Sequence, residues 1–236
     1  MLEHHGYSAR FAAFAADFAA AAIQRQEALQ AFLPQGAWEV DLDARTLVLG
    51  NERLYGVTLL GTFAHSDRTW LWGWANPGFG WDEPAVAPLR GMYAYGRRQN
   101  IPELTTGVLD FSSFPEPLRA AGALAILAAV PLGGCGVHAV EVNDGAGQCF
   151  LHLDDPRGPK PGLDPVTAPR LIMSAIEAFP DDHRRVVRGF LTHHGAELDE
   201  SSGQILTRVP EGLLIADFDD RNRLTNLSFK GDRGEW

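Results

Sequence analysis

The sequence predicts an α+β protein: an antiparallel sheet meander with helices packed on one side, plus a small C-terminal α+β unit. Three observations predict this class. Apolar residues recur at helical spacing near the N-terminus. The period then changes to two, in short runs separated by tight turns, which is typical of antiparallel strands. Helix before strand recurs near the C-terminus, and at 45% hydrophobic and 21% charged the 236-residue chain can bury an ordinary core.

The first predicted element is a helix over residues 8–32, which Ser8 can cap and Pro34 can end. Four short strands with tight turns between them should follow as an antiparallel meander. We place these strands at residues 38–42, 46–49, 55–64 and 68–76.

The next predicted elements are two helices and a hairpin. The helices cover residues 83–100 and 115–130, and prolines near the start of the first are tolerated there. The hairpin pairs residues 137–142 with 148–153 around a turn centred on Gly145. Residues 104–111 could be a strand or an extended loop.

A proline-rich segment divides the chain. Five of the 15 prolines fall between residues 155 and 169, where they disfavour helix and sheet. We therefore predict a main domain over residues 1–155, a linker over 156–169 and a small unit over 170–236. The small unit should contain two helices, at about 168–178 and 181–195, and then three antiparallel strands, at 204–209, 213–218 and 224–229.

The most distinctive feature is a tryptophan-rich segment within the predicted strand at 68–76. On a strand, Trp70, Trp72 and Trp74 share one face, because successive side chains alternate. They either form the packed face of the sheet or line an aromatic pocket with Asn76 and Trp81 at its mouth. The second interpretation makes these five residues the candidate ligand-binding site.

The segment Trp-x-Trp-Gly-Trp-Ala-Asn, residues 70–76, resembles the signature of a family of uncharacterised bacterial proteins, mainly from actinobacteria and other GC-rich bacteria. In that family a helix and a meander precede the tryptophan strand. An Ala/Leu-rich helix and a hairpin follow it, as residues 115–153 do here. The resemblance covers residues 10–155, and it implies no known activity, substrate or catalytic residue.

Histidines and a cysteine are the candidates for metal binding or catalysis. If the hairpin turn centres on Gly145, His138 and His152 face each other at a distance that would let them share a metal ion, and a shift of one residue would separate them. Ordinary hydrogen-bonded histidines are the alternative, so we predict no metal site. An enzyme of unrecognised type could use His138, His152 or Cys135 with a carboxylate such as Glu141.

Charge and cysteine content limit the partners and the compartment. The net charge is -10 and divides evenly between the two halves, which disfavours nucleic acid as a partner. No stretch is long and apolar enough for a membrane span, and no signal peptide is evident. Cys135 and Cys149 are expected as free buried thiols, which suits a reducing cytoplasmic compartment.

The sequence contains no phosphate-binding loop and no Gly-x-Ser-x-Gly elbow. We therefore expect a non-catalytic module that binds another protein or a small apolar ligand, without a cofactor. The alternatives are the unrecognised enzyme and an immunity- or chaperone-like partner protein. A homodimer is a further alternative, because a meander leaves edge strands.

Overall fold

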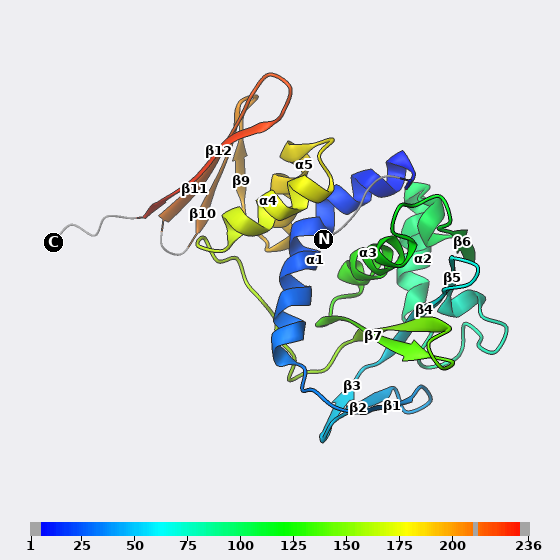
Figure 1. Cartoon of the computed structure of the whole chain (residues 1–236). Coiled ribbons are helices and arrows are strands. Elements are labelled where there is room, and N and C mark those ends of the chain that lie inside the picture. Colours follow the sequence, from blue (N-terminus) through cyan, green and yellow to red (C-terminus); the bar gives the residue numbers. More distant parts are fainter. Residues whose placement is uncertain (1–5, 210–211, 232–236) are drawn as a thin grey trace. The chain divides into compact units, whose positions relative to one another are not determined.

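The computed structural model describes residues 6–209 and 212–231, and within them the α+β class is confirmed (Figure 1). The helices are α1 (Ala9–Phe32), α2 (Leu89–Gln99), α3 (Pro117–Ala129), α4 (Ala168–Ala178) and α5 (His183–His193). The strands are β1 (Trp38–Asp41), β2 (Thr46–Leu49), β3 (Glu52–Tyr55), β4 (Thr58–Ala64), β5 (Thr69–Trp72), β6 (Val108–Asp110), β7 (Gly136–Val142), β8 (Gly147–Leu153), β9 (Leu198–Glu200), β10 (Gln204–Val209), β11 (Gly212–Phe218) and β12 (Leu224–Gly231). No helix in these ranges has both the length and the apolar character that a membrane span requires.

The chain forms two compact units. One contains Ala12–Gln24 together with the chain from Pro161 onward, and the other contains Arg25–Lys160 with the residues just before Ala12. Helix α1 thus contributes residues to both units. The passage from Lys160 to Pro161 falls within the proline-rich segment.

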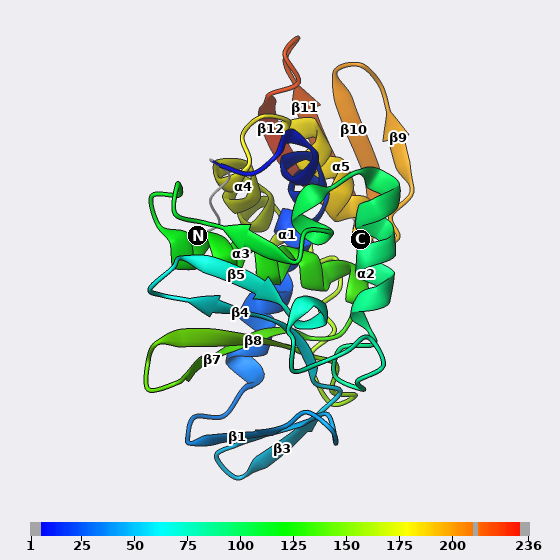
Figure 2. The ribbon, with the colours of Figure 1, turned by 90° about the vertical axis from the view of Figure 1, so that its right-hand side faces the viewer.

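The larger unit has two antiparallel sheets, not one continuous meander. Strands β1, β2 and β3 form a three-stranded sheet, and a five-stranded sheet has the order β6-β5-β4-β8-β7 (Figure 2). The predicted strand at 55–64 is interrupted at Gly56, which has a φ of 70° and lies against the Asp154 backbone, where a Cβ would come within 2.5 Å of the carbonyl oxygen. This break ends one sheet and begins the other.

A shared hydrophobic core joins the two sheets of this unit. Leu47 and Leu54 of the small sheet pack with Val140 and Leu151 of the β7–β8 hairpin and with Leu29 near the end of α1. Helix α3 contacts β4, β7 and β8. The C-terminal part of α1, the small sheet and strand β7 therefore lie together within one packed unit.

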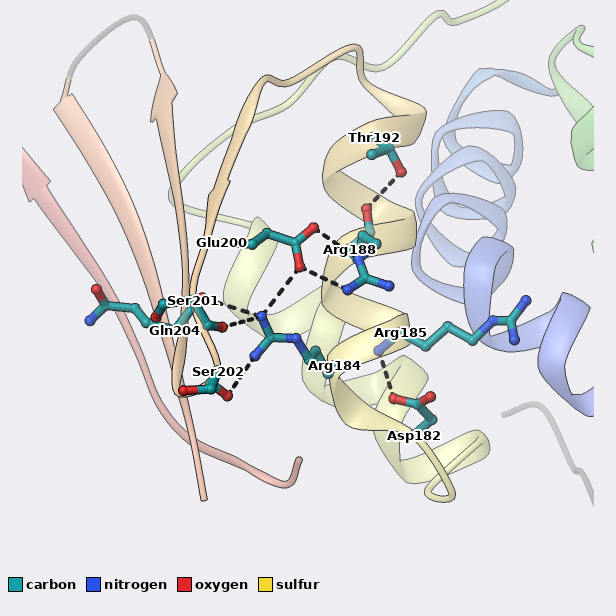
Figure 3. Close-up of polar contacts among 9 residues, drawn as sticks. All are labelled: Asp182, Arg184, Arg185, Arg188, Thr192, Glu200, Ser201, Ser202 and Gln204. Atoms are coloured by element: carbon teal, nitrogen blue, oxygen red, sulfur yellow. Dashed lines mark hydrogen bonds and ion pairs between the residues drawn. The ribbon is translucent and has the colours of Figure 1, made fainter. Parts of the chain in front are cut away.

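The C-terminal unit matches its predicted arrangement of two helices and three long strands. Its sheet has the order β12-β11-β10-β9, and the three-residue strand β9 is the one addition to the prediction. Arg184 and Arg188 of α5 attach this helix to the end of β9, and Arg184 also binds the turn between β9 and β10 (Figure 3). Arg188 binds both carboxylate oxygens of Glu200, at 2.9 and 2.7 Å, and Arg184 donates to Glu200 and to the carbonyls of Ser201 and Ser202.

This cluster makes the stability of the C-terminal unit depend on pH. Hydrogen bonds from Arg188 and then Arg184 hold the pKa of Glu200 below its ordinary value. The stabilisation is therefore complete above the unfolded-state pKa and is lost as the pH falls through the lower folded-state pKa. We expect Glu200→Gln to lower the free energy of unfolding by about 1 kcal/mol at pH 7 and by much less at pH 3. Urea unfolding at both pH values measures this. The exposed Asp220→Asn is the matched control, and an equal loss for Glu200→Gln at both pH values would contradict the account.

Candidate functional site

Trp70 and Trp72 lie in the core of the five-stranded sheet. Both side chains are 0% exposed, and their rings meet edge to face with centroids 5.1 Å apart. The Trp72 indole N–H donates to the Glu103 carbonyl at 2.9 Å, and Trp70 packs against Phe150. A ligand could not reach either indole without opening the sheet, so their position supports the packing interpretation.

Trp74 does not share the strand face of Trp70 and Trp72, which corrects the predicted strand at 68–76. Strand β5 ends at Trp72, and residues Gly73–Ala75 form a 3-10 turn. Gly73 lies so close to the backbone of Leu59 that a Cβ would come within 2.3 Å of its carbonyl oxygen. The chain therefore leaves the sheet at this glycine and carries Trp74 away from the other two indoles.

Trp74 instead belongs to a partly exposed aromatic cluster with Trp81 and Tyr93. The two indoles are parallel, at 6°, with centroids 5.4 Å apart, and the Tyr93 ring meets both edge to face. The Arg90 guanidinium lies 5.7 Å from the Trp81 ring. The Asn76 side chain accepts a hydrogen bond from the backbone of its own loop. The Trp74 and Trp81 indoles therefore stack on each other, and the Arg90 guanidinium lies over the Trp81 ring.

His138 and His152 do not face each other, because the hairpin turn is not centred on Gly145. His138 is paired with Leu151 and His152 with Val137, so the two imidazoles point to opposite faces of the hairpin. The physical reason is the turn: it has four residues, 143–146, between the pair Val142 and Gly147. Its centre lies between Asp144 and Gly145, which shifts the register by one residue.

His152 and Cys135 are both buried, and each contacts a backbone carbonyl. His152 is 3% exposed, its Nε2 lies 3.0 Å from the Gly133 carbonyl oxygen, and burial lowers its pKa. The Cys135 thiol faces the Asp155 carbonyl at 3.4 Å, and burial raises its pKa. The described part of the chain holds no group of three or more His, Cys, Asp or Glu side chains that could bind a metal ion.

Both cysteines are free and buried, as predicted, and they should react slowly in the folded chain. Burial raises the pKa of Cys149 to about 12 and also raises that of Cys135. Because the thiolate is the reactive form, we expect Cys149 to react with Ellman's reagent at pH 8 roughly a thousandfold more slowly than in the unfolded chain. Labelling with and without urea measures this, and rapid labelling of the folded chain would contradict the buried placement.

The structure presents a different candidate site, at the free edge of β7. Gln26 of α1 donates to the Val137 carbonyl at 2.8 Å and accepts from the Val137 N–H at 3.1 Å, so the backbone groups of Val137 point away from β8. Backbone groups of alternate strand residues point to the same side. The backbone N–H and C=O groups of Ala139 and Glu141 therefore also point outward. Within the described residues, no loop or side chain forms a hydrogen bond with these groups.

A groove of about 550 Å³ lies along this open edge, and we refer to it as the β7 groove. One wall is the end of α1 and the residues after it, and the other is the start of β1 with the end of β2. The lining residues are Gln30, Leu33, Pro34, Gln35, Gly36, Trp38, Leu49, His138, Ala139, Val140 and Glu141. Trp38 is 40% exposed and pairs with Leu49 across the small sheet, so it presents an indole to the groove.

A second, smaller pocket of about 260 Å³ shares part of this lining. It adds Ile126 of α3 and Phe150 of β8, which pairs with Ala139. Gln30, Leu33, His138 and Ala139 line both spaces. Strand β7 thus has hollows beside both faces of its open edge.

Sequence reasoning did not identify this site. From the sequence, Glu141 and His138 are candidate catalytic residues, with an ordinary hydrogen-bonded histidine as the alternative for His138, and Trp38 is the first residue of a predicted strand. The available signal was a tryptophan at the start of the predicted strand that follows the helix end. The edge position of β7 depends on the order of strands in the sheet, which local patterns do not contain.

The comparisons with known proteins agree with one expectation. A family of unknown function, DUF6882, has a model that matches residues 12–156, and a family without known activity was expected over residues 10–155. Comparison with curated proteins and with solved structures returned no match. The β7 groove and the aromatic cluster both lie within the matched residues.

Proposed function

Because the chain belongs to the DUF6882 family of unknown function, whose matched region contains the β7 groove, we propose that it is a non-catalytic protein-binding module. Its partner is an extended segment of another protein, which adds as a further strand along β7. The observation that carries this proposal is the open backbone of Ala139 and Glu141 beside a groove with an exposed indole. Main-chain hydrogen bonds provide affinity in this mode of recognition, and pockets for alternate side chains provide specificity.

The contact between Gln26 and β7 supports strand addition, because the Gln26 side chain forms the hydrogen bonds that an added strand would form. Its primary amide supplies a donor and an acceptor to Val137, as a neighbouring strand would. This contact covers the first part of the edge and leaves the part from Ala139 onward open. A long open edge promotes aggregation, so its restriction to a short stretch suits selective binding.

An extended peptide suits the groove better than a small apolar ligand does. Small-molecule sites are usually enclosed and mostly apolar, with few polar groups. The floor here is a strand edge with outward N–H and C=O groups, and the lining includes Gln30, Gln35, His138 and Glu141. A peptide backbone can satisfy such an edge, whereas an apolar molecule would leave it without hydrogen bonds.

Hydrogen exchange tests this function. The probe is a library of randomised ten-residue peptides displayed on phage and selected on the immobilised full chain. With a selected peptide bound, we expect the amides of Ala139 and Glu141 to exchange more slowly, while the amides that already pair with β8 change little. Protection confined to the aromatic cluster around Trp81 would overturn the proposal in favour of that surface.

A further inference from the structure

The charges around the β7 groove bear on what kind of segment binds there. Its lining contains one carboxylate, Glu141, and no lysine or arginine. Burial lowers the pKa of His138, which disfavours its charged form. Glu141 is therefore the main charged side chain of the groove, and its charge is negative.

The end of α1 adds to this negative character. The helix has 24 residues, its last turn contains no basic residue, and it ends at Phe32 with Leu33 as the C-cap. Leu33 and Pro34 line the groove, so the carbonyl end of the helix lies at its wall. The helix dipole favours a cation near this end. Glu141 and the helix terminus thus act in the same direction from two different elements.

The alternation of β7 assigns different side-chain environments to successive residues of an added strand. Directly opposed residues in a sheet place their side chains on the same face. A residue opposite Ala139 would face the smaller pocket beside Ile126 and Phe150. A residue opposite Val140 would face the side of Trp38 and Leu49, and a residue opposite Glu141 would lie next to its carboxylate.

We infer that the segment bound at β7 is a basic, extended segment of another protein, with a small apolar, a large apolar and a basic residue at three successive positions, opposite Ala139, Val140 and Glu141. This inference rests on the proposed function and names its partner class. The large side chain packs on Trp38, and the lysine or arginine pairs with Glu141 near the end of α1. A second copy of this chain is a poorer occupant, because each copy has a net charge of -10 at pH 7 and the groove is itself acidic.

Peptide selection with charge-reversed chains tests the inference. We expect peptides selected on the full chain to be enriched in this three-residue pattern. Glu141→Lys should weaken their binding at least tenfold, and replacing the peptide's basic residue with glutamate should restore binding to the Glu141→Lys chain. The matched control is Glu83→Lys, an exposed position outside the groove with the same change in net charge, and it should weaken binding less than threefold.

Distinct outcomes separate the failure of this inference from failure of the proposed function. One outcome would overturn the inference and leave strand addition standing. In it, peptides bind the Glu141→Lys chain as tightly as the native chain but lose binding to the Ala139→Pro chain, which lacks the Ala139 N–H. Binding that survives removal of the Ala139 N–H, or selection of no peptide at all, would overturn both. Sedimentation of the chain alone provides the last check, since self-association abolished by Ala139→Pro would identify a second copy as the occupant and overturn the inference.

Discussion

Ala139→Pro should remove peptide binding to the β7 groove while leaving the chain folded. The Ala139 N–H points away from β8, so its loss breaks no hydrogen bond within the sheet. Proline is tolerated on edge strands when the missing N–H faces solvent. In the complex, the same change removes one hydrogen bond, leaves a peptide carbonyl unpaired and adds a ring at the contact. We expect the dissociation constant to rise at least tenfold, which corresponds to about 1.4 kcal/mol or more.

The matched control for this change is Ala139→Ser, which alters the side chain and keeps the N–H. Fluorescence anisotropy of a labelled selected peptide measures the affinity of both variants, and circular dichroism during urea unfolding checks the fold. Serine should retain affinity within about threefold. Equal losses for proline and serine would show that side-chain contacts carry the binding, which would contradict strand addition.

Trp72→Ala should strongly destabilise the folded chain. The side chain is fully buried, packs edge to face with Trp70 and donates to the Glu103 carbonyl. Its removal creates a cavity and leaves that buried acceptor unpaired. We expect the free energy of unfolding to fall by about 3–5 kcal/mol, a large fraction of the total for an ordinary domain. Urea unfolding followed by circular dichroism measures the change.

Two further variants show whether the loss of stability in Trp72→Ala comes from the core position of its ring. Trp72→Phe keeps an aromatic ring and loses the N–H. It should therefore lower the free energy of unfolding by less than Trp72→Ala does, and it should leave peptide binding unchanged. Trp81→Phe, in the partly exposed cluster, should also cost less than Trp72→Ala, because its ring is not enclosed by the core. A Trp72→Ala chain of native stability would contradict the core placement of this indole.

Local signals were sufficient for most helices and strands. Helix α4 occupies the predicted 168–178, β10 occupies the predicted 204–209, and Ser8 caps α1 by accepting the Phe11 N–H. Proline, glycine and capping residues mark these boundaries, and each of them lies within a few residues of the boundary in the sequence. Strand β3 was missed because Leu54 is its only buried side chain, so its pattern does not alternate clearly.

Features that depend on tertiary packing could not be predicted in the same way. The division into two sheets depends on the approach of Gly56 to the Asp154 backbone, and the strand pattern contains only the glycine. The register of the β7–β8 hairpin depends on the exact length of its turn. The four-residue turn pairs His138 with Leu151 and not with His152. The outward direction of the Ala139 backbone becomes evident only once Gln26 is seen beside Val137.

An N-methyl scan of a selected peptide tests strand addition most directly. Each variant peptide carries one methylated backbone amide, which removes one donor and keeps every side chain. Residues of an added strand point their amides toward β7 at every second position. The account predicts that methylation weakens binding at alternate positions of the segment beside Ala139 and Glu141 and has little effect at the positions between them. Losses without this alternation, or no loss at any position, would contradict the addition of a strand to β7.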